Sequence, residues 1–332
     1  MKIMIVGGTG LLGYHTALAA LADGHEVASF GIDDLDLAGW YPPRIKVSFG
    51  DIFKMSEDEL IPVFKGYEAF VYSVGPDDRV TPPAPAYEFF RLRLVEHCAK
   101  VFRAARRAGV RRAVVFNSYF AYFDRMYPEK KLSEHHPYIR CRVEQASELL
   151  SQAGEMEVMI LELPYIFGSM PGRAPLWGDV LIERFFRFPA VVFPKGGTTM
   201  ITAKHVGEAA VGALKYGEPG ARYPIGDENH NYRIMLEAML EGLGMKKPIF
   251  QISAGICAAG AALMEKHSAA KGLQSGLNLK RLMLDIMSEE LYIPDEINEA
   301  NSELLRFGRG GVREGILEAV RAAYPDGFRR KG

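Results

Sequence analysis

The chain has 332 residues, of which 48% are hydrophobic and 24% are charged, the balance of an ordinary soluble globular protein. Its 40 basic and 41 acidic side chains give a net charge of -1. A general nucleic-acid binder needs a basic excess, so this class is excluded. The length exceeds the usual size of a single core, so we expect one large domain with an appended lobe, or two domains.

Three cysteines, Cys98, Cys141 and Cys257, lie far apart and lack the spacing of a metal site, which indicates free thiols in a reducing compartment. The apolar stretch near the N-terminus is too short for a signal peptide. The longest apolar run, residues 254–264, is about half as long as a membrane span. We therefore expect a cytoplasmic protein with no metal site and no contact with membranes or nucleic acid.

The first half of the chain alternates between strands and helices. Strands are predicted at 2–6, 25–30, 45–49, 68–74, 112–117 and 157–163. Helices are predicted at 11–23, 57–65, 86–108 and 138–153. Strands that alternate with helices form a parallel sheet through right-handed crossovers. The pattern therefore predicts an α/β protein with a doubly wound parallel sheet, the Rossmann arrangement.

The second half follows a different pattern. Residues 171–198 are rich in proline, glycine and aromatic side chains, whereas a helix at 205–216 and a strand at 221–226 resume the alternation. From about residue 231 the chain is mainly helical. We predict a Rossmann domain over 1–168 to which 199–230 returns, and a smaller, mostly helical substrate lobe formed by 169–198 and 231–332. The small-residue stretch 254–264 indicates either a tightly packed helix or the wall of an apolar substrate pocket.

A glycine loop follows the first strand directly. Its three glycines serve a tight turn, the approach of the backbone to a pyrophosphate, and close packing of helix on strand. The N–H groups at the start of the following helix then face the anionic diphosphate. The loop therefore predicts a dinucleotide site formed by Gly7, Thr9, Gly10, Leu11, Leu12 and Gly13.

The choice between NAD and NADP depends on the residues after the second strand. Acidic residues arrive late there, at Asp33 and Asp34, and no Arg or Lys occurs between Lys2 and Arg44. The 2′-phosphate of NADP would face acids without a local cation. NAD is therefore favoured over NADP, with Asp33 on the adenosine ribose. The alternative is that these acids form only a solvated loop.

These motifs resemble the extended short-chain dehydrogenase/reductase superfamily, and within it the NAD-dependent epimerase/dehydratase family. The sequence GGTGLLG at 7–13 is similar to the family's glycine pattern, 108–118 to the strand that leads to its catalytic Ser, and 163–168 to its loop beside the nicotinamide. The resemblance implies further cofactor contacts from Asp51, Ile52, Ser73, Val74, Gly75, Pro164 and Ile166.

The active-site signature of this family is Tyr-x-x-x-Lys, and the chain departs from it. Tyr138 is followed four residues later by Arg142. Residues four apart share one helix face, so the Arg142 charge and the oxidised nicotinamide together are placed to lower the pKa of Tyr138 toward neutrality. The resemblance implies that Tyr138 moves the proton, Arg142 supplies the charge and Ser118 binds the substrate oxygen. A second alignment places His136 and Arg140 at the catalytic positions instead.

The resemblance implies an NAD(P)-dependent oxidoreductase or epimerase/dehydratase that acts on a small carbonyl or alcohol. Nucleotide sugars are the family's common substrates, whereas the aromatic side chains between 177 and 193 equally suit an apolar substrate. The alternative function is a redox sensor or regulatory protein, which binds the cofactor without turnover because the signature Lys is missing.

Helices 86–108 and 138–153 carry apolar stripes. On the first helix the stripe consists of Phe90, Leu94, Val101 and Ala105. In the family that the chain resembles, these two helices commonly pair across a two-fold axis. We therefore expect a homodimer.

Overall fold

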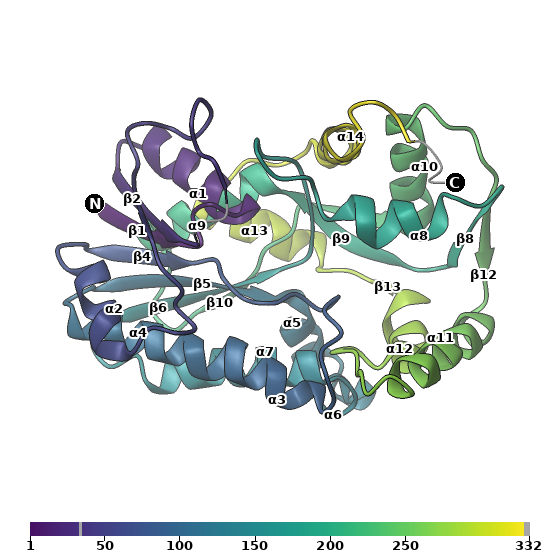
Figure 1. Cartoon of the computed structure of the whole chain (residues 1–332), viewed down its shortest axis with the longest axis horizontal. Coiled ribbons are helices and arrows are strands. Elements are labelled where there is room, and N and C mark those ends of the chain that lie inside the picture. Colours follow the sequence, from purple (N-terminus) through teal and green to yellow (C-terminus); the bar gives the residue numbers. More distant parts are fainter. Residues whose placement is uncertain (33–34, 329–332) are drawn as a thin grey trace.

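The computed structural model describes residues 1–32 and 35–328. Among them, seven parallel strands form the main sheet in the order β10-β6-β5-β4-β1-β2-β3 (Figure 1). Their bounds are Lys2–Val6 (β1), Glu26–Gly31 (β2), Lys46–Phe49 (β3), Ala69–Tyr72 (β4), Arg112–Ser118 (β5), Glu157–Leu163 (β6) and Arg222–Pro224 (β10). The chain moves outward from β1 in both directions, so the order reverses between β1 and β4. The predicted doubly wound sheet is confirmed.

Helices cover both faces of this sheet (Figure 1). On one side lie α1 (Leu11–Ala22) and α9 (Ala203–Tyr216), and on the other α2 (Glu57–Phe64), α4 (His97–Arg107) and α7 (Pro137–Ser151). Alternate residues of β1 enter the two cores, Ile3 and Ile5 on the α1 side and Met4 and Val6 on the α4 side. A strand that is buried on both faces consists of a continuous run of apolar residues, which is why the strand at residues 2–6 could be predicted from the sequence.

The long helix predicted at 86–108 forms as α3 (Ala86–Phe90), a π-helical segment (Arg91–Glu96) and α4. Its apolar stripe does not face outward. Phe90, Leu94, Val101 and Ala105 are all fully buried within the chain's own cores. The stripe therefore offers no surface to a second copy, and the reasoning from it to a homodimer is wrong.

A second lobe, drawn at the right of Figure 1, contains helices and short strands. Its strands are β7 (Tyr165–Phe167), β8 (Val191–Pro194), β9 (Gly197–Thr202), β11 (Glu228–Asn231), β12 (Ile249–Ile252) and β13 (Glu290–Leu291). Its helices include α8 (Glu183–Phe185), α10 (Tyr232–Gly242), α11 (Ala254–Ala269), α12 (Leu279–Leu282) and α14 (Val312–Ala323). Strand β9 pairs with β7, β11 and β13, while β8 pairs with β12. Within the predicted bounds 169–198 and 231–332 the lobe is mostly helical, as predicted, while the short strands of two to six residues were not predicted because they leave little periodicity to detect.

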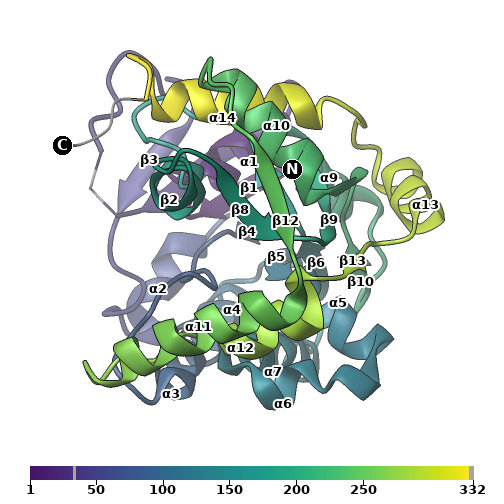
Figure 2. The ribbon, with the colours of Figure 1, turned by 90° about the vertical axis from the view of Figure 1, so that its right-hand side faces the viewer.

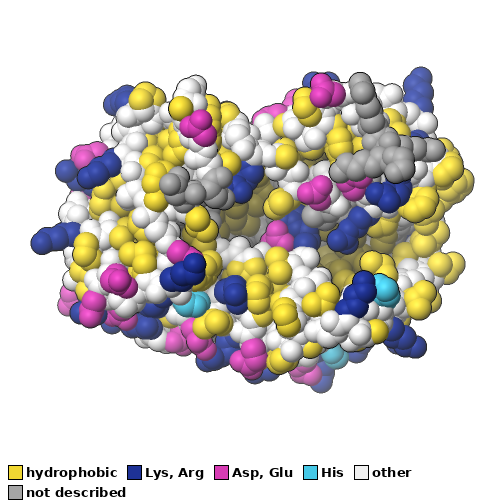
Figure 3. Space-filling view, viewed as in Figure 1, with side chains coloured by type: hydrophobic (Ala, Val, Ile, Leu, Met, Phe, Trp, Pro, Cys, Tyr) yellow, Lys and Arg dark blue, Asp and Glu magenta, His cyan; other side chains and the backbone are white. Residues whose placement is uncertain are grey.

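Several segments connect the two lobes. After β5, the helices α5 (Tyr119–Met126) and α6 (Leu132–His135) lead to α7, and α13 (Asp295–Leu305) returns from the second lobe to pack on α9 and β10. Strand β12 runs directly into α11, which lies below it in Figure 2. Figure 3 shows that the surface is hollowed between the two lobes.

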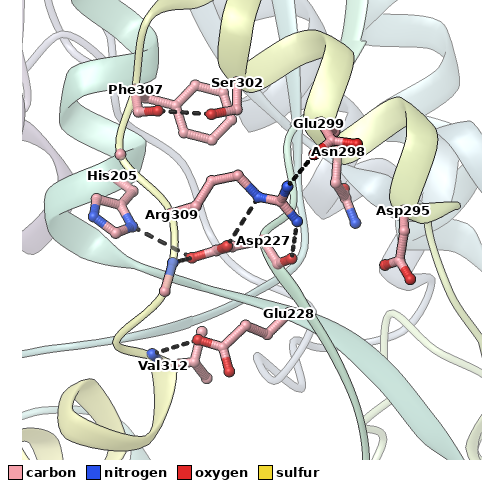
Figure 4. A network of polar contacts seen from close by, with 12 residues as sticks. His205, Asp227, Glu228, Asp295, Asn298, Glu299, Ser302, Phe307, Arg309 and Val312 are labelled. Atoms are coloured by element: carbon pink, nitrogen blue, oxygen red, sulfur yellow. Dashed lines mark hydrogen bonds and ion pairs between the residues drawn. The ribbon is translucent and has the colours of Figure 1, made fainter.

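A buried carboxylate anchors the C-terminal segment (Figure 4). Asp227 accepts a hydrogen bond from the Gly310 N–H at 2.6 Å and lies 3.4 Å from His205 Nδ1 and 3.5 Å from Arg309 Nε. This network ties the connection between α13 and α14 to the start of β11. Among the described helices, none combines the length and apolar character needed to cross a bilayer.

Candidate cofactor and active site

The hollow between the lobes is a cleft of about 1560 Å³. It opens at the carboxyl edge of the main sheet, beside β1 and β4, where the strand order reverses. In doubly wound sheets this crevice is where ligands bind. Small-molecule pockets usually measure roughly 300–1,000 Å³, so the cleft has room for a cofactor and a substrate together.

The glycine loop has the geometry of a diphosphate cradle. Gly7 has a φ of +89°, and a Cβ on Gly13 would lie 2.1 Å from the Gly7 carbonyl oxygen, so both positions require glycine. A Cβ on Gly10 would meet only that carbonyl oxygen, at 3.4 Å, because Gly10 borders the open cleft. No described side chain caps α1, which leaves the N–H groups of its first turn for an anion. The loop therefore fits the diphosphate of a dinucleotide.

Most of the predicted cofactor residues lie along the cleft. Those in its lining are Gly10, Leu11, Leu12, Ser73, Val74, Gly75, Pro164 and Ile166. Gly7, Thr9 and Gly13 complete the loop behind them. Asp51 and Ile52 follow β3 at the same edge of the sheet, where Asp51 accepts a hydrogen bond from the Phe53 N–H at 3.0 Å. Asp33 lies outside the described residues.

Tyr138 and Arg142 lie together in the cleft wall, one turn apart on α7. Arg142 Nε donates a hydrogen bond to the Tyr138 hydroxyl oxygen at 2.9 Å. Arg142 Nη1 donates to the Phe116 carbonyl oxygen at 3.2 Å and to Gln145 Oε1 at 2.9 Å. Tyr138 is 3% exposed and Arg142 is 8% exposed, so the guanidinium is buried with its donors satisfied on two sides.

Ser118 is linked to this pair through its neighbour. The Asn117 amide donates to the Arg142 carbonyl oxygen at 2.9 Å and to Gln145 Oε1 at 3.1 Å, and its oxygen accepts from the Ser118 N–H at 2.6 Å. Ser118 Oγ caps α5 by accepting from the Phe120 N–H at 3.3 Å, and Ser118 also lines the cleft. Because Ser118 Oγ acts as the acceptor in that bond, its hydroxyl can still donate its proton to an acceptor that enters the cleft.

The electrostatics differ from the sequence-based prediction in one respect. Burial raises the pKa of the Tyr138 hydroxyl above its ordinary value, and the Arg142 guanidinium opposes this effect without reversing it. The Asp78 carboxylate raises the pKa of Tyr138 further. The protein's own groups therefore do not lower the pKa of Tyr138, because burial of the hydroxyl outweighs the effect of one cation, and the part of the prediction that invokes the oxidised nicotinamide stays a prediction.

The alternative register places its two residues elsewhere. His136 is fully buried, and its Nδ1 accepts a hydrogen bond from the Asn278 N–H at 3.0 Å. Arg140 is half-exposed, forms a 2.8 Å ion pair with Glu144 and lies over the Tyr87 ring. Neither His136 nor Arg140 is among the described residues that line the cleft. The geometry favours the Tyr138 and Arg142 register.

Sequence reasoning missed a charged segment that follows β4. Asp77, Asp78 and Arg79 all line the cleft. Arg79 Nη2 lies 2.5 Å from Asp77 Oδ2, and its guanidinium lies 5.5 Å from the centre of the Trp177 ring. Burial raises the pKa of the Asp78 carboxyl, while Arg79 opposes that shift. Their position just after a central strand was the available signal, because residues there reach the carboxyl edge of the sheet.

In the part of the chain that the structure describes, no three metal-binding side chains gather into a metal site. His205, which belongs to the network of Figure 4, is not among the described cleft residues either.

Comparisons with known proteins agree with this geometry. Residues 7–166 match the model of a family described as NAD(P)H-binding. No curated protein matches the chain in sequence. Among solved structures, the chain is similar to gox2253, with 18% identity over 98% of both chains and a TM-score of 0.75. It is also similar to a nucleoside-diphosphate-sugar epimerase from Pseudomonas aeruginosa, with 18% identity over 98% of both chains and a TM-score of 0.72.

A third similar structure is that of UDP-glucuronic acid 4-epimerase from Bacillus cereus in complex with NAD. It shares 11% identity over 99% of this chain and 100% of that chain, with a TM-score of 0.67. At these identities the likeness establishes a shared fold over the whole chain. The family match lies in the first part of that fold, over residues 7–166.

Proposed function

We propose that this chain, which carries an NAD(P)H-binding domain within the fold of the extended short-chain dehydrogenases/reductases, is an NAD(P)-dependent oxidoreductase or epimerase/dehydratase. Its substrate is a carbonyl compound or an alcohol. The observation that carries this proposal is the hydrogen bond between Arg142 and Tyr138 in the wall of the cleft that the glycine loop borders.

The direction of that hydrogen bond assigns the proton. Arg142 Nε is always a donor, so the Tyr138 oxygen accepts from it and keeps its own proton for another partner. The raised pKa keeps Tyr138 protonated near neutrality, which suits a proton donor to a carbonyl oxygen. Ser118, which lines the same cleft, would bind that oxygen through its hydroxyl. A bound nicotinamide would supply the hydride to the carbonyl carbon, or accept it in the reverse reaction.

The glycine loop and α1 would hold the diphosphate, and Pro164 and Ile166 would border the nicotinamide. NAD is favoured over NADP, because the chain has no Arg or Lys between Lys2 and Arg44 to pair with a 2′-phosphate. The similar epimerase from Bacillus cereus, whose structure contains NAD, supports the same choice.

The second candidate function is a redox sensor that binds the cofactor without turnover. Two observations favour it: the signature Lys is replaced by Arg142, and the pKa of Tyr138 is raised rather than lowered. Arg cannot release a proton, so any relay that needs Lys is lost.

One experiment separates the two functions. The affinities for NADH and NADPH are measured by fluorescence titration, and oxidation of the bound cofactor is then followed with a panel of aldehydes and ketones. Turnover that Tyr138→Phe abolishes supports the enzyme. Tight cofactor binding with no turnover across the panel supports the sensor. A wild-type chain that shows neither cofactor binding nor turnover refutes both proposed functions.

The homodimer remains a prediction, which now rests on the helix pairing common in the family that the chain resembles and no longer on the stripe of the first helix. The stripe through Phe90 and Leu94 is used inside the chain. Sedimentation at micromolar concentration decides the matter: a species of twice 36.9 kDa would show a dimer that uses residues other than this stripe.

A further inference from the structure

The outer half of the cleft has two apolar walls, formed by residues 176–194 and 252–287. Every residue between 252 and 287 is described, and none of those that line the cleft is Asp, Glu, Lys, Arg or His. Among the described lining residues of the other wall, Arg184 is the one charged side chain. A ligand in this half of the cleft would therefore meet mostly carbon.

Large apolar side chains on these walls remain in contact with water. Five of them keep 43% to 63% of their surface exposed to water: Leu176, Phe188, Val192, Ile256 and Met264. Exposed apolar residues that gather in one concave region mark a binding site. Their burial by an apolar ligand is favourable, since it removes hydrocarbon surface from water.

Helix α11 leaves space in the cleft rather than filling it. Among its described residues only Ala258 and Ala261 are buried, although its residues 254–264 are all apolar. Gly260 lines the cleft, and a Cβ placed on it would find no described atom within 4 Å. The prediction of a tightly packed helix is thus wrong, and the alternative reading of this segment as a pocket wall fits the structure.

The apolar wall is attached to the catalytic helix. After α11 the chain crosses to the N-terminus of α7, where the Gly276 carbonyl oxygen accepts a hydrogen bond from the Tyr138 N–H at 2.8 Å. Two residues later, the Asn278 N–H donates to His136 Nδ1. The α11 wall and Tyr138 therefore line the same cleft, and none of the α11 residues in that lining is charged.

Away from the glycine loop, the charged side chains of the cleft do not match a second diphosphate, such as that of a nucleotide sugar. A diphosphate is best bound by guanidinium groups that present paired donors. Arg142 already donates to Tyr138, Phe116 and Gln145, and Arg79 is paired with Asp77. Asp77 and Asp78 add negative charge to the same cleft, which opposes an anionic ligand. Arg173 and Arg184, at the rim, are the other two arginines in the described lining.

We infer that the substrate is an uncharged, largely apolar ketone or secondary alcohol, whose body lies between α11 and the 176–194 wall while its oxygen reaches Tyr138. This inference rests on the proposed function, and it replaces the nucleotide sugar as the substrate class. The small residues of α11 would set the length of the substrate that the cleft accepts.

Binding is tested separately from turnover, with the uncharged fluorescent probe N-phenyl-1-naphthylamine on the full chain. We expect the probe to bind and to be displaced by 2-undecanone but not by UDP-glucose. Ile256→Glu and Met264→Glu should weaken probe binding by about tenfold, the loss expected when roughly one apolar side-chain contact is replaced by a charge. Leu263→Glu is the matched control, because Leu263 neighbours Met264 on α11 and is 70% exposed but is not a cleft residue.

Gly260→Leu tests whether the space beside α11 sets the length of the ligand that the cleft accepts. It inserts a side chain into open space, so the protein should fold while its affinity for 2-undecanone falls more than its affinity for 2-butanone. The NADH affinity of all four variants should equal that of the wild type. Displacement of the probe by UDP-glucose, or equal probe affinities for Met264→Glu and Leu263→Glu, would overturn the inference.

The two proposals fail in different ways. Loss of NADH binding, or no turnover of any carbonyl by a chain that still binds the probe, refutes the proposed function and leaves the apolar site in place. Turnover of UDP-glucose with no displacement of the probe by 2-undecanone keeps the enzyme and refutes the apolar substrate.

Discussion

Arg142 and Tyr138 form a fixed donor–acceptor pair, with Arg142 Nε 2.9 Å from the Tyr138 hydroxyl oxygen. The guanidinium cannot turn away, because Phe116 and Gln145 hold its Nη1. Asn117 donates to the same Gln145 side chain, so the orientation of the pair is set by residues of β5 and α7 together. A lysine at 142 could not make this planar set of contacts.

Tyr138→Phe is expected to lower kcat by roughly 10² to 10⁴-fold, because it removes the group that donates the proton. The NADH affinity should change little, since the lost hydroxyl faces the substrate. Steady-state kinetics and cofactor titration measure the two effects. Tyr165→Phe provides the control: Tyr165 lines the same cleft but its hydroxyl contacts Met287 rather than a cation. Undiminished turnover in Tyr138→Phe would remove Tyr138 from the mechanism.

Asp78→Asn is expected to move the pH profile. The Asp78 carboxylate raises the pKa of Tyr138, in addition to burial, so its neutralisation lowers that pKa. In the direction of alcohol oxidation, Tyr138 must be deprotonated, and the rising limb of kcat/KM against pH should therefore shift to lower pH. Asp78→Glu retains the charge and should leave the limb in place. An unshifted limb in Asp78→Asn would show that this carboxyl is already neutral in the free enzyme.

Gly10→Val is expected to abolish NADH binding while the chain stays folded. A Cβ at this position meets only the Gly7 carbonyl oxygen, at an ordinary contact distance of 3.4 Å, but it projects where the diphosphate must approach. Gly13→Ala should instead lower the stability of the fold, because its Cβ would lie 2.1 Å from the same oxygen and must disrupt the loop. Thermal denaturation and NADH titration distinguish the two. Normal NADH affinity in folded Gly10→Val would contradict the assigned cradle.

His136→Asn is expected to flatten the dependence of stability on pH. Burial lowers the pKa of His136 from 6.5 to about 4. As the pH falls below 6.5 the unfolded chain takes up a proton that the folded chain refuses until about pH 4, so stability is lost across this window as the pH falls. The loss approaches about 3 kcal/mol of unfolding free energy at its end.

Urea denaturation at pH 7 and pH 4.5 measures this change. The Asn side chain keeps an acceptor for the Asn278 N–H but does not titrate, so the stability of His136→Asn should differ less between the two pH values. His267→Asn, at an exposed position of α11, should retain the wild-type difference. Equal pH dependence in all three proteins would show that other groups govern acid unfolding.

Much of the fold could be predicted from local sequence. The central strands of the main sheet are apolar on both faces, and Gly7, Gly10 and Gly13 identify the βα turn at which a dinucleotide is expected to bind. The pairing of Tyr138 with Arg142 followed from their spacing on one helix. The face of a helix, however, does not reveal what covers it, and the stripe through Phe90 and Leu94 was covered by the chain itself rather than by a second copy.

The rest of the site depended on tertiary structure. Asp78 and Arg79 follow β4 at the carboxyl edge of the sheet, which was an available signal, but that these two side chains line the cleft is known only from the folded chain. The hydrogen bond from Asn117 to Gln145 joins β5 to α7, and these two elements come into contact only when the chain folds. The pKa of Tyr138 also required the structure, since burial outweighs the neighbouring cation.

The path of the chain between the lobes also governs how the protein unfolds. Strand β10 follows the first excursion into the second lobe and pairs with β6. Helix α9 packs so closely on α1 that a Cβ on Gly207 would lie 2.5 Å from the backbone of His15. Later still, α13 returns so closely to α9 that a Cβ on Gly212 would lie 1.7 Å from the Leu305 carbonyl oxygen.

Neither lobe is therefore a continuous piece of chain. A fragment that ends at residue 168 would lack β10, the outer partner of β6, and α9, the helix that covers Ala17 and Ala20, so a bare sheet edge and an apolar face would be open to aggregation. The two lobes have interlocked cores, and their melting should be a single cooperative event rather than two.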